Sequence, residues 1–121
     1  MKSDEELTRF ITSSFPSVWA LEALLVLKRA DHRLSSQELI ARLRASELVI
    51  KQALHRLVAA GLVSIDEEGY ATYVPSDQNS RLVEATDDLY GRRPDAVRRM
   101  IVTSNTTGLT AFADAFRLRK D

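Results

Sequence analysis

The segment "LSSQELIARLRASELVIKQALHRLVAAG" constrains the fold of this chain more than any other part of it. Ser35 is followed three residues later by Glu38, which is the spacing of a capping box and predicts a helix over about 36–44. Ser46 is a second N-cap residue, and Gly61 supplies the left-handed residue that often follows a helix. The segment therefore predicts two helices joined by the short turn "RAS", which is a helix-turn-helix.

A β-hairpin is expected directly after these helices. The segments "LVSI" and "YATYV" are short and rich in β-branched and aromatic residues, and "DEEG" separates them. Gly69 can adopt the positive φ that a hairpin turn requires, and Pro75 closes the hairpin. Leu34 is expected to form a short strand as well. The predicted fold class is mainly α with a small β-hairpin (α+β).

Two helices are expected upstream of the helix-turn-helix. Ser3 and Glu6 have the spacing of a capping box, and Pro16 should end a first helix that starts at about Asp4. A second helix over about 17–30 is apolar almost all round, which predicts that it is covered on several sides and forms the centre of the core.

Three amphipathic segments follow Pro75, and we expect each to be a helix. The first repeats apolar residues seven apart, Leu82 with Leu89 and Val83 with Tyr90, which is the spacing of a helical seam. The second begins near Pro94. The last places one apolar face at helical spacing, made of Leu109, Phe112, Ala113 and Phe116.

These segments predict two parts, a domain over 1–75 and a helical extension over 76–121 that is expected to be a dimerisation element. One small domain does not need so much apolar surface, so we expect a homodimer held by the terminal helices. The alternative is that the extension folds back over its own domain.

The order of helices, turn and hairpin resembles the winged helix-turn-helix transcriptional regulators, most closely the MarR-like and GntR-like DNA-binding domains. The match extends loosely upstream over "SVWALEALLVLKRADHR" and is absent from the C-terminal extension. The resemblance implies a winged helix-turn-helix with a C-terminal helical extension, in a DNA-binding regulator of transcription whose helix near 46–60 lies in the major groove of double-stranded DNA. The residues that carry the resemblance are Ser46, Ile50, Ala53, Leu54, Leu57, Gly61, Leu62 and Val63.

The solvent-facing side of the helix near 46–60 is where DNA-binding residues are expected. At 100° per residue the apolar core positions fall on one side, and polar residues fall on the other. Glutamine can bond adenine, lysine can reach guanine or a phosphate, and an apolar residue can touch a thymine methyl group. The candidate base-contacting residues are Leu48, Lys51, Gln52 and His55, and the further candidates, chiefly for phosphate contacts, are Ser35, Ser36, Arg42, Arg44, Ser46 and Arg56.

The charge of the chain is zero overall but unevenly distributed. Residues 28–56 hold seven basic and three acidic side chains, a net of +4, whereas residues 57–80 hold four acidic and no basic side chains. The predicted hairpin is therefore acidic, where many winged-helix relatives carry a basic residue that enters the minor groove. We expect the acidic hairpin to stay clear of the DNA backbone, which lowers affinity and makes a second subunit more important.

A winged helix can also serve as a protein–protein interaction module without DNA binding. Lys, Gln and His on an exposed helix face are ordinary solubilising residues, and a net charge of zero suits this alternative better than it suits DNA binding. The contact surface would then include Leu48, Val49 and the acidic hairpin. A protein partner is therefore the alternative to DNA.

No motif in the sequence supports another class of function. The chain has no cysteine, its two histidines lie in different elements, and its four glycines lack a phosphate-binding spacing, so we expect no metal, no cofactor and no enzyme activity. The longest apolar run is interrupted by Glu22 and is too short to span a membrane. The acidic N-terminus does not resemble a signal peptide, so the expected location is the cytoplasm.

Overall fold

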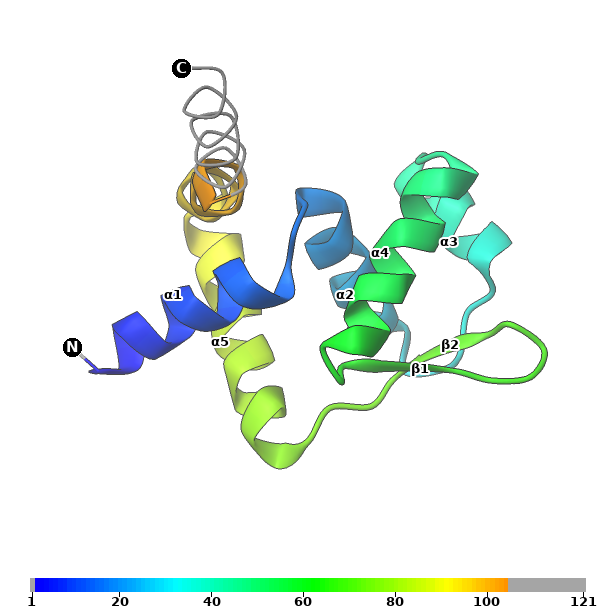
Figure 1. The fold of residues 1–121 in the computed structure, drawn as a ribbon, viewed down its shortest axis with the longest axis horizontal. Coiled ribbons are helices and arrows are strands. Elements are labelled where there is room, and N and C mark those ends of the chain that lie inside the picture. Colours follow the sequence, from blue (N-terminus) through cyan, green and yellow to red (C-terminus); the bar gives the residue numbers. More distant parts are fainter. Residues whose placement is uncertain (1, 105–121) are drawn as a thin grey trace, which may run out of the picture.

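The computed structural model describes residues 2–104 of the 121-residue chain, with side chains from residue 5 onward (Figure 1). The described part is mainly helical with one two-stranded antiparallel sheet, and a further helix covers residues 94–104. The other elements are α1 (Lys2–Ser14), α2 (Val18–Ala30), α3 (Ser36–Leu43), α4 (Glu47–Ala59), β1 (Val63–Ile65), β2 (Ala71–Tyr73) and α5 (Asp77–Arg92).

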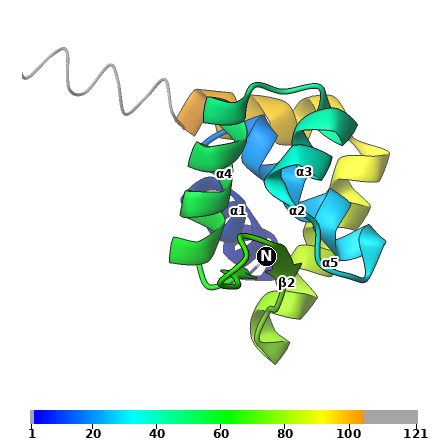
Figure 2. The ribbon, with the colours of Figure 1, turned by 90° about the vertical axis from the view of Figure 1, so that its right-hand side faces the viewer.

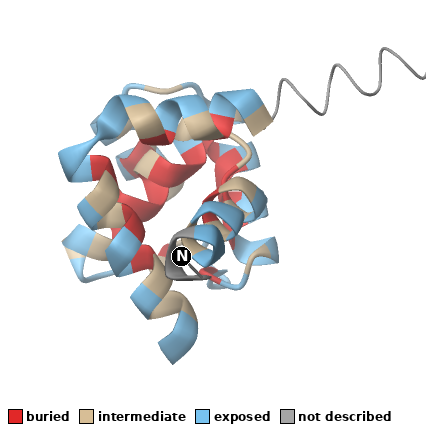
Figure 3. Cartoon of the chain, turned by 90° about the vertical axis from the view of Figure 1, so that its left-hand side faces the viewer, coloured by how far each residue is buried: buried red, intermediate tan, exposed pale blue. Residues whose placement is uncertain are grey.

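Helix α2 lies at the centre of the molecule, as its apolar composition predicts. α1 and α5 lie on one side of it, and α3, α4 and the sheet lie on the other (Figures 1 and 2). Buried residues face the space between the helices, and the outer surfaces are exposed (Figure 3). The residues of α2 that are buried are Ala20, Leu21, Ala23, Leu24, Leu25 and Leu27.

Serine residues cap the N-termini of four of the helices. In each case the serine oxygen accepts a hydrogen bond from the backbone N–H three residues further on, over 3.1 to 3.2 Å. The predicted capping box is present, because the Glu38 carboxylate also accepts from the Ser35 N–H over 3.0 Å. The four capping serines are Ser17, Ser35, Ser46 and Ser76.

The predicted start of α1 is wrong by two residues. The helix begins at Lys2, one residue before Ser3, which was expected to cap it. Helix ends fray, so a boundary predicted from a capping residue commonly differs from the observed one by one or two residues. Its predicted end before Pro16 is confirmed, and Phe10 packs edge-to-face on the buried Phe15 with ring centroids 5.7 Å apart. Among the described residues, no single helix has the length and hydropathy of a membrane span; α1 and α2 reach them only as a pair bent by 101°.

The turn between α3 and α4 and the end of α4 both use left-handed residues. Arg44 has a φ of 55° and ends α3, and the following Ala45 N–H donates to the Ile40 carbonyl over 3.3 Å. Gly61 has a φ of 77°, which glycine adopts without strain, so the predicted end of α4 is confirmed.

The hairpin has the predicted position. In its antiparallel register Val63 is opposite Tyr73 and Ile65 is opposite Ala71. Leu34 forms no strand of the expected kind but a single isolated bridge, which joins it to Ala71 through two backbone hydrogen bonds of 2.8 and 3.0 Å. The bridge joins the segment before α3 to the hairpin.

The described part of the C-terminal extension packs against its own domain. Val83 and Tyr90, two residues of the predicted seam, are buried in the same core as α2. Asp87 adds ion pairs to Lys28 at 3.1 Å and Arg29 at 2.8 Å on α2. The homodimer stays a prediction; the last apolar face, which includes Leu109, Phe112, Ala113 and Phe116, lies outside the described residues.

Replacing Leu54 by alanine tests this core. Leu54 on α4 is 3% exposed, so Leu54→Ala should lower the free energy of unfolding by about 2 to 5 kcal/mol through lost apolar contacts and a cavity. Val58→Ala is the matched control, because Val58 lies on the same helix, is 42% exposed, and should change stability by at most about 0.5 kcal/mol. Urea unfolding measures both, and equal losses would contradict the described packing of α4.

Candidate nucleic-acid interface

Helix α4 exposes the side that helical periodicity predicts. Ile50, Ala53, Leu54 and Leu57 are buried against the core. The opposite side, which we name the α4 face, is exposed and consists of Leu48, Lys51, Gln52, His55 and Arg56.

A groove of about 770 Å³ runs between the α4 face and the start of α2, and we name it the α2–α4 groove. One wall consists of Pro16, Ser17 and Trp19, and the other consists of the α4 face together with Val49 and Ala53. Trp19 is 42% exposed and Leu48 is 62% exposed, so the groove presents apolar surface to water. The prediction that α2 is covered on several sides is confirmed by its buried residues, and Trp19 in its first turn is the exposed exception.

A second hollow, of about 390 Å³, separates α4 from the hairpin. Lys51 and His55 line both this hollow and the α2–α4 groove, so they form the ridge between the two. Val58 and Ile65 add exposed apolar surface on the hairpin side, and Ser36 contributes the rim at the start of α3. The structure thus brings six predicted residues around one ridge: Ser36, Leu48, Lys51, Gln52, His55 and Arg56.

The other predicted residues lie outside both hollows. Ser35 and Ser46 use their hydroxyl oxygens to cap α3 and α4, and the Ser35 N–H is bonded to Glu38, so both are primarily helix-capping residues. The pKa of Glu38 is lowered, chiefly by the Ser35 N–H and also by the nearby Arg42. Arg42 and Arg44 are exposed on the α3 side of the turn.

The acidic tip of the hairpin has a structural role that the sequence analysis missed. The Asp66 carboxylate accepts backbone N–H bonds from Glu68 at 3.0 Å and Tyr70 at 2.9 Å, and the Gly69 N–H donates to the Asp66 carbonyl at 2.9 Å. Gly69 has the predicted positive φ, 88°. Asp66 therefore forms the turn itself, as short acidic side chains often do.

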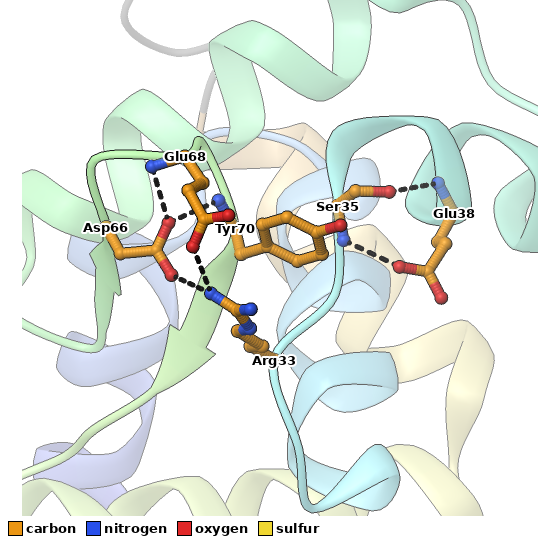
Figure 4. Close-up of polar contacts among 6 residues, drawn as sticks. All are labelled: Arg33, Ser35, Glu38, Asp66, Glu68 and Tyr70. Atoms are coloured by element: carbon orange, nitrogen blue, oxygen red, sulfur yellow. Dashed lines mark hydrogen bonds and ion pairs between the residues drawn. The ribbon is translucent and has the colours of Figure 1, made fainter.

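Arg33, in the loop before α3, contacts the carboxylates of this tip (Figure 4). Its Nη1 donates to Asp66 over 2.7 Å and to Glu68 over 3.1 Å, and its guanidinium lies 4.2 Å from the centroid of the Tyr70 ring. The pKa of Asp66 is lowered, chiefly by the Tyr70 N–H and next by Arg33. Two of the three carboxylates at the tip therefore have a cationic partner.

The ion pairs redistribute the charge that the sequence suggests. Lys28 and Arg29 form ion pairs with α5, and Arg33 forms ion pairs with the hairpin. Three of the seven basic residues in 28–56 are therefore engaged in ion pairs. Within residues 2–104 the remaining four form no ion pair, although Arg42 lies near Glu38. These four basic residues surround the α3–α4 turn and the α4 face: Arg42, Arg44, Lys51 and Arg56.

The chain matches no protein-family model, no curated protein and no solved structure. A function has to be inferred from the α4 face, its two hollows and the hairpin.

Replacing Arg33 by glutamine tests the contact between the loop and the hairpin tip. Arg33→Gln should raise the pKa of Asp66, measured by NMR titration, but leave it below its ordinary value of 3.8, because the backbone N–H bonds remain. A lowered carboxyl pKa stabilises the fold at pH values above 3.8, and this stabilisation is lost as the pH falls through the folded-state pKa. The variant should therefore lose less stability between neutral and acidic pH.

Arg29→Gln is the control for this titration. It removes an exposed arginine that pairs with Asp87 on α5, away from the hairpin, and should leave the pKa of Asp66 unchanged. An unchanged Asp66 pKa in Arg33→Gln would show that Arg33 does not hold the tip.

Proposed function

We propose that this chain is a winged helix-turn-helix regulator of transcription that binds double-stranded DNA with α4 in the major groove. The observation that carries the proposal is the set of four basic side chains that form no ion pair with the described side chains, residues 5–104, and that surround an exposed helix face. Cations that are not used within the fold are available to phosphates, which supply most of the affinity of DNA-binding proteins. Arg42, Arg44, Lys51 and Arg56 would make these contacts.

The α4 face supplies chemistry suited to base edges. Gln52 can donate to and accept from adenine, and Lys51 or His55 can donate to guanine acceptors. Leu48, in the first turn of α4, can touch a thymine methyl group. Because these residues are exposed on one face of a helix whose other face is buried, they could enter the major groove without disturbing the core.

The acidic hairpin opposes DNA binding less than its sequence suggests. Arg33 partly neutralises Asp66 and Glu68, so within the described residues Glu67 is the tip carboxylate without an ion pair. A carboxylate about 10 Å from a phosphate is already screened at physiological salt, where the Debye length is about 8 Å. The hairpin can therefore lie beside the duplex as a wing, provided that it does not touch the backbone.

The expected homodimer would complete this proposal. Two subunits would set two α4 helices about one DNA turn apart and would require a pseudo-palindromic site. Two weak modules on one duplex would also offset the modest charge of each.

A protein-interaction module remains the second candidate function, because of the apolar surface beside α4. Trp19 and Leu48 are exposed in the α2–α4 groove, and Val58 and Ile65 are exposed in the hollow beside the hairpin. Side chains of this kind are typical of the centre of protein interfaces. A module of this type would bind a random duplex negligibly at any salt concentration, which distinguishes it from the DNA-binding proposal.

Substitutions on the α4 face and at the turn should have different effects on DNA binding. Gln52→Ala should reduce the preference for the selected site over random duplex, because it removes a base contact. Arg44→Ala should weaken all duplexes alike and reduce the salt slope of binding by about one unit, because it removes a phosphate contact. Arg92→Ala, an exposed arginine on α5, is the control and should change neither.

These effects can be measured by fluorescence anisotropy with labelled duplexes, after selection of bound genomic fragments has provided a site. If Gln52→Ala and Arg44→Ala both behave like Arg92→Ala, the proposed surface is wrong.

Reversing the free charge at the hairpin tip tests where the hairpin lies. Glu67→Lys should tighten binding to random duplex if the hairpin lies beside the backbone, and it leaves the contacts of Arg33 intact. Glu5→Lys makes the same change of charge on α1, on the other side of the molecule, and controls for net charge (Figure 1). Equal effects of the two substitutions would place the hairpin away from the duplex.

A further inference from the structure

The α2–α4 groove has apolar surface that the described residues leave uncovered. Trp19, at the start of α2, is 42% exposed, and Leu48, at the start of α4, is 62% exposed. Both line this groove together with the half-buried Val49. Exposed apolar surface gathered in one groove is a characteristic of a binding site.

The described part of the chain ends at Ser104, beside the helix that leads into this groove. The end of helix 94–104 lies against α1, because Thr103 and Ser104 line one hollow together with Thr12. Thr12 is four residues before Pro16, which lines the α2–α4 groove. Ser104, which precedes residues 105–121, therefore lies beside the C-terminal half of α1, and the chain after α1 enters the groove wall at Pro16.

The sequence of this segment suits an apolar groove. Four residues, "NTTG", separate Ser104 from the apolar face, and an extended chain of that length spans roughly 13 Å. The spacing i, i+3, i+4, i+7 gives a helix one apolar face, and two of the four phenylalanines of the chain fall on it. The face consists of Leu109, Phe112, Ala113 and Phe116.

We propose that residues 105–121 dock this apolar face into the α2–α4 groove of their own chain, over Trp19 and Leu48. Docking removes both exposed side chains from water, and the short connection favours the intramolecular contact over a contact with another chain. The docked segment covers the groove side of the α4 face, including Gln52 and Arg56. On the proposed function, on which this consequence rests, the docked segment inhibits DNA binding and holds back the expected homodimer, which uses the same apolar face, until a second subunit or the duplex displaces it.

Trp19 reports directly on the groove, because it is the only tryptophan of the chain. In the full-length chain, Phe112→Ser with Phe116→Ser should shift the Trp19 emission to longer wavelength and increase its quenching by acrylamide. Leu48→Ser, an exposed change on the groove side, should have the same effect without altering the segment. Val102→Ser removes a 55% exposed apolar side chain from helix 94–104 and should leave the emission unchanged.

Far-UV circular dichroism confirms that each variant is folded. We call the double substitution Phe112→Ser with Phe116→Ser the tail variant. Unchanged Trp19 emission in both the tail variant and Leu48→Ser would overturn the docking proposal. Trp19 quenching that falls as the protein concentration rises would also overturn it, because the segment would then occupy the groove of a second copy.

Duplex binding by the tail variant separates docking from the proposed function. If the docked state holds about nine tenths of the molecules, the tail variant should bind DNA about tenfold more tightly than the unaltered chain. Increased Trp19 quenching with unchanged duplex affinity would support docking and overturn the inhibition. Increased quenching with no duplex binding by either protein would support docking and count against the DNA-binding function alone.

Discussion

The burial of α2 is the constraint on which the rest of the structure depends. A helix that is apolar on most of its surface has to be covered from several directions, and here α4, α3 and β2 supply most of the cover, while α5 is joined to α2 by ion pairs and by the Tyr90–Glu22 hydrogen bond. α4 meets this requirement with Ile50, Leu54 and Leu57, and its polar residues are thereby turned outward. The exposed α4 face is therefore a consequence of core packing, and it is available for binding without cost to the fold.

Ion pairs decide which charges remain available on this framework. Lys28 and Arg29 attach α5 to α2, and Arg33 attaches the loop before α3 to the hairpin. These contacts pair the charges of three basic residues within the fold, although Arg29 and Arg33 stay exposed, and they give acidic residues a structural role. The result is a chain with a net charge of zero that still carries a cluster of cations around the α3–α4 turn, none of which pairs with a carboxylate among the described residues. Net charge is thus a poor guide to what this surface can bind.

Features determined by local sequence could be predicted, and features determined by distant contacts could not. The caps at Ser35 and Ser46 and the turns at Gly61 and Gly69 each depend on a few neighbouring residues, and all four are present as predicted. The pairing of Arg33 with a tip 33 residues away depends on how the loop meets the hairpin, which no spacing rule reveals. Periodicity also placed the α4 face correctly, because one helix determines it.

Two further features depended on the packing of whole helices. Trp19 lies in the apolar run of α2, yet it is 42% exposed in the groove between α2 and α4, and the run alone does not reveal this. The apolar residues of α5 have the spacing of an intermolecular seam, yet Val83 and Tyr90 fill the core of their own chain. A spacing that suits a helical partner does not specify whether the partner is the same molecule.

If the cations around α4 that form no ion pair among the described residues bind duplex DNA, the affinity must fall as the salt concentration rises. Binding of the unaltered chain to a random-sequence duplex is measured from low to physiological salt. We expect log affinity to fall linearly with log salt concentration, with a slope of roughly −3 to −4 if Arg42, Arg44, Lys51 and Arg56 each neutralise one phosphate. A slope near zero, or no binding at low salt, would contradict it.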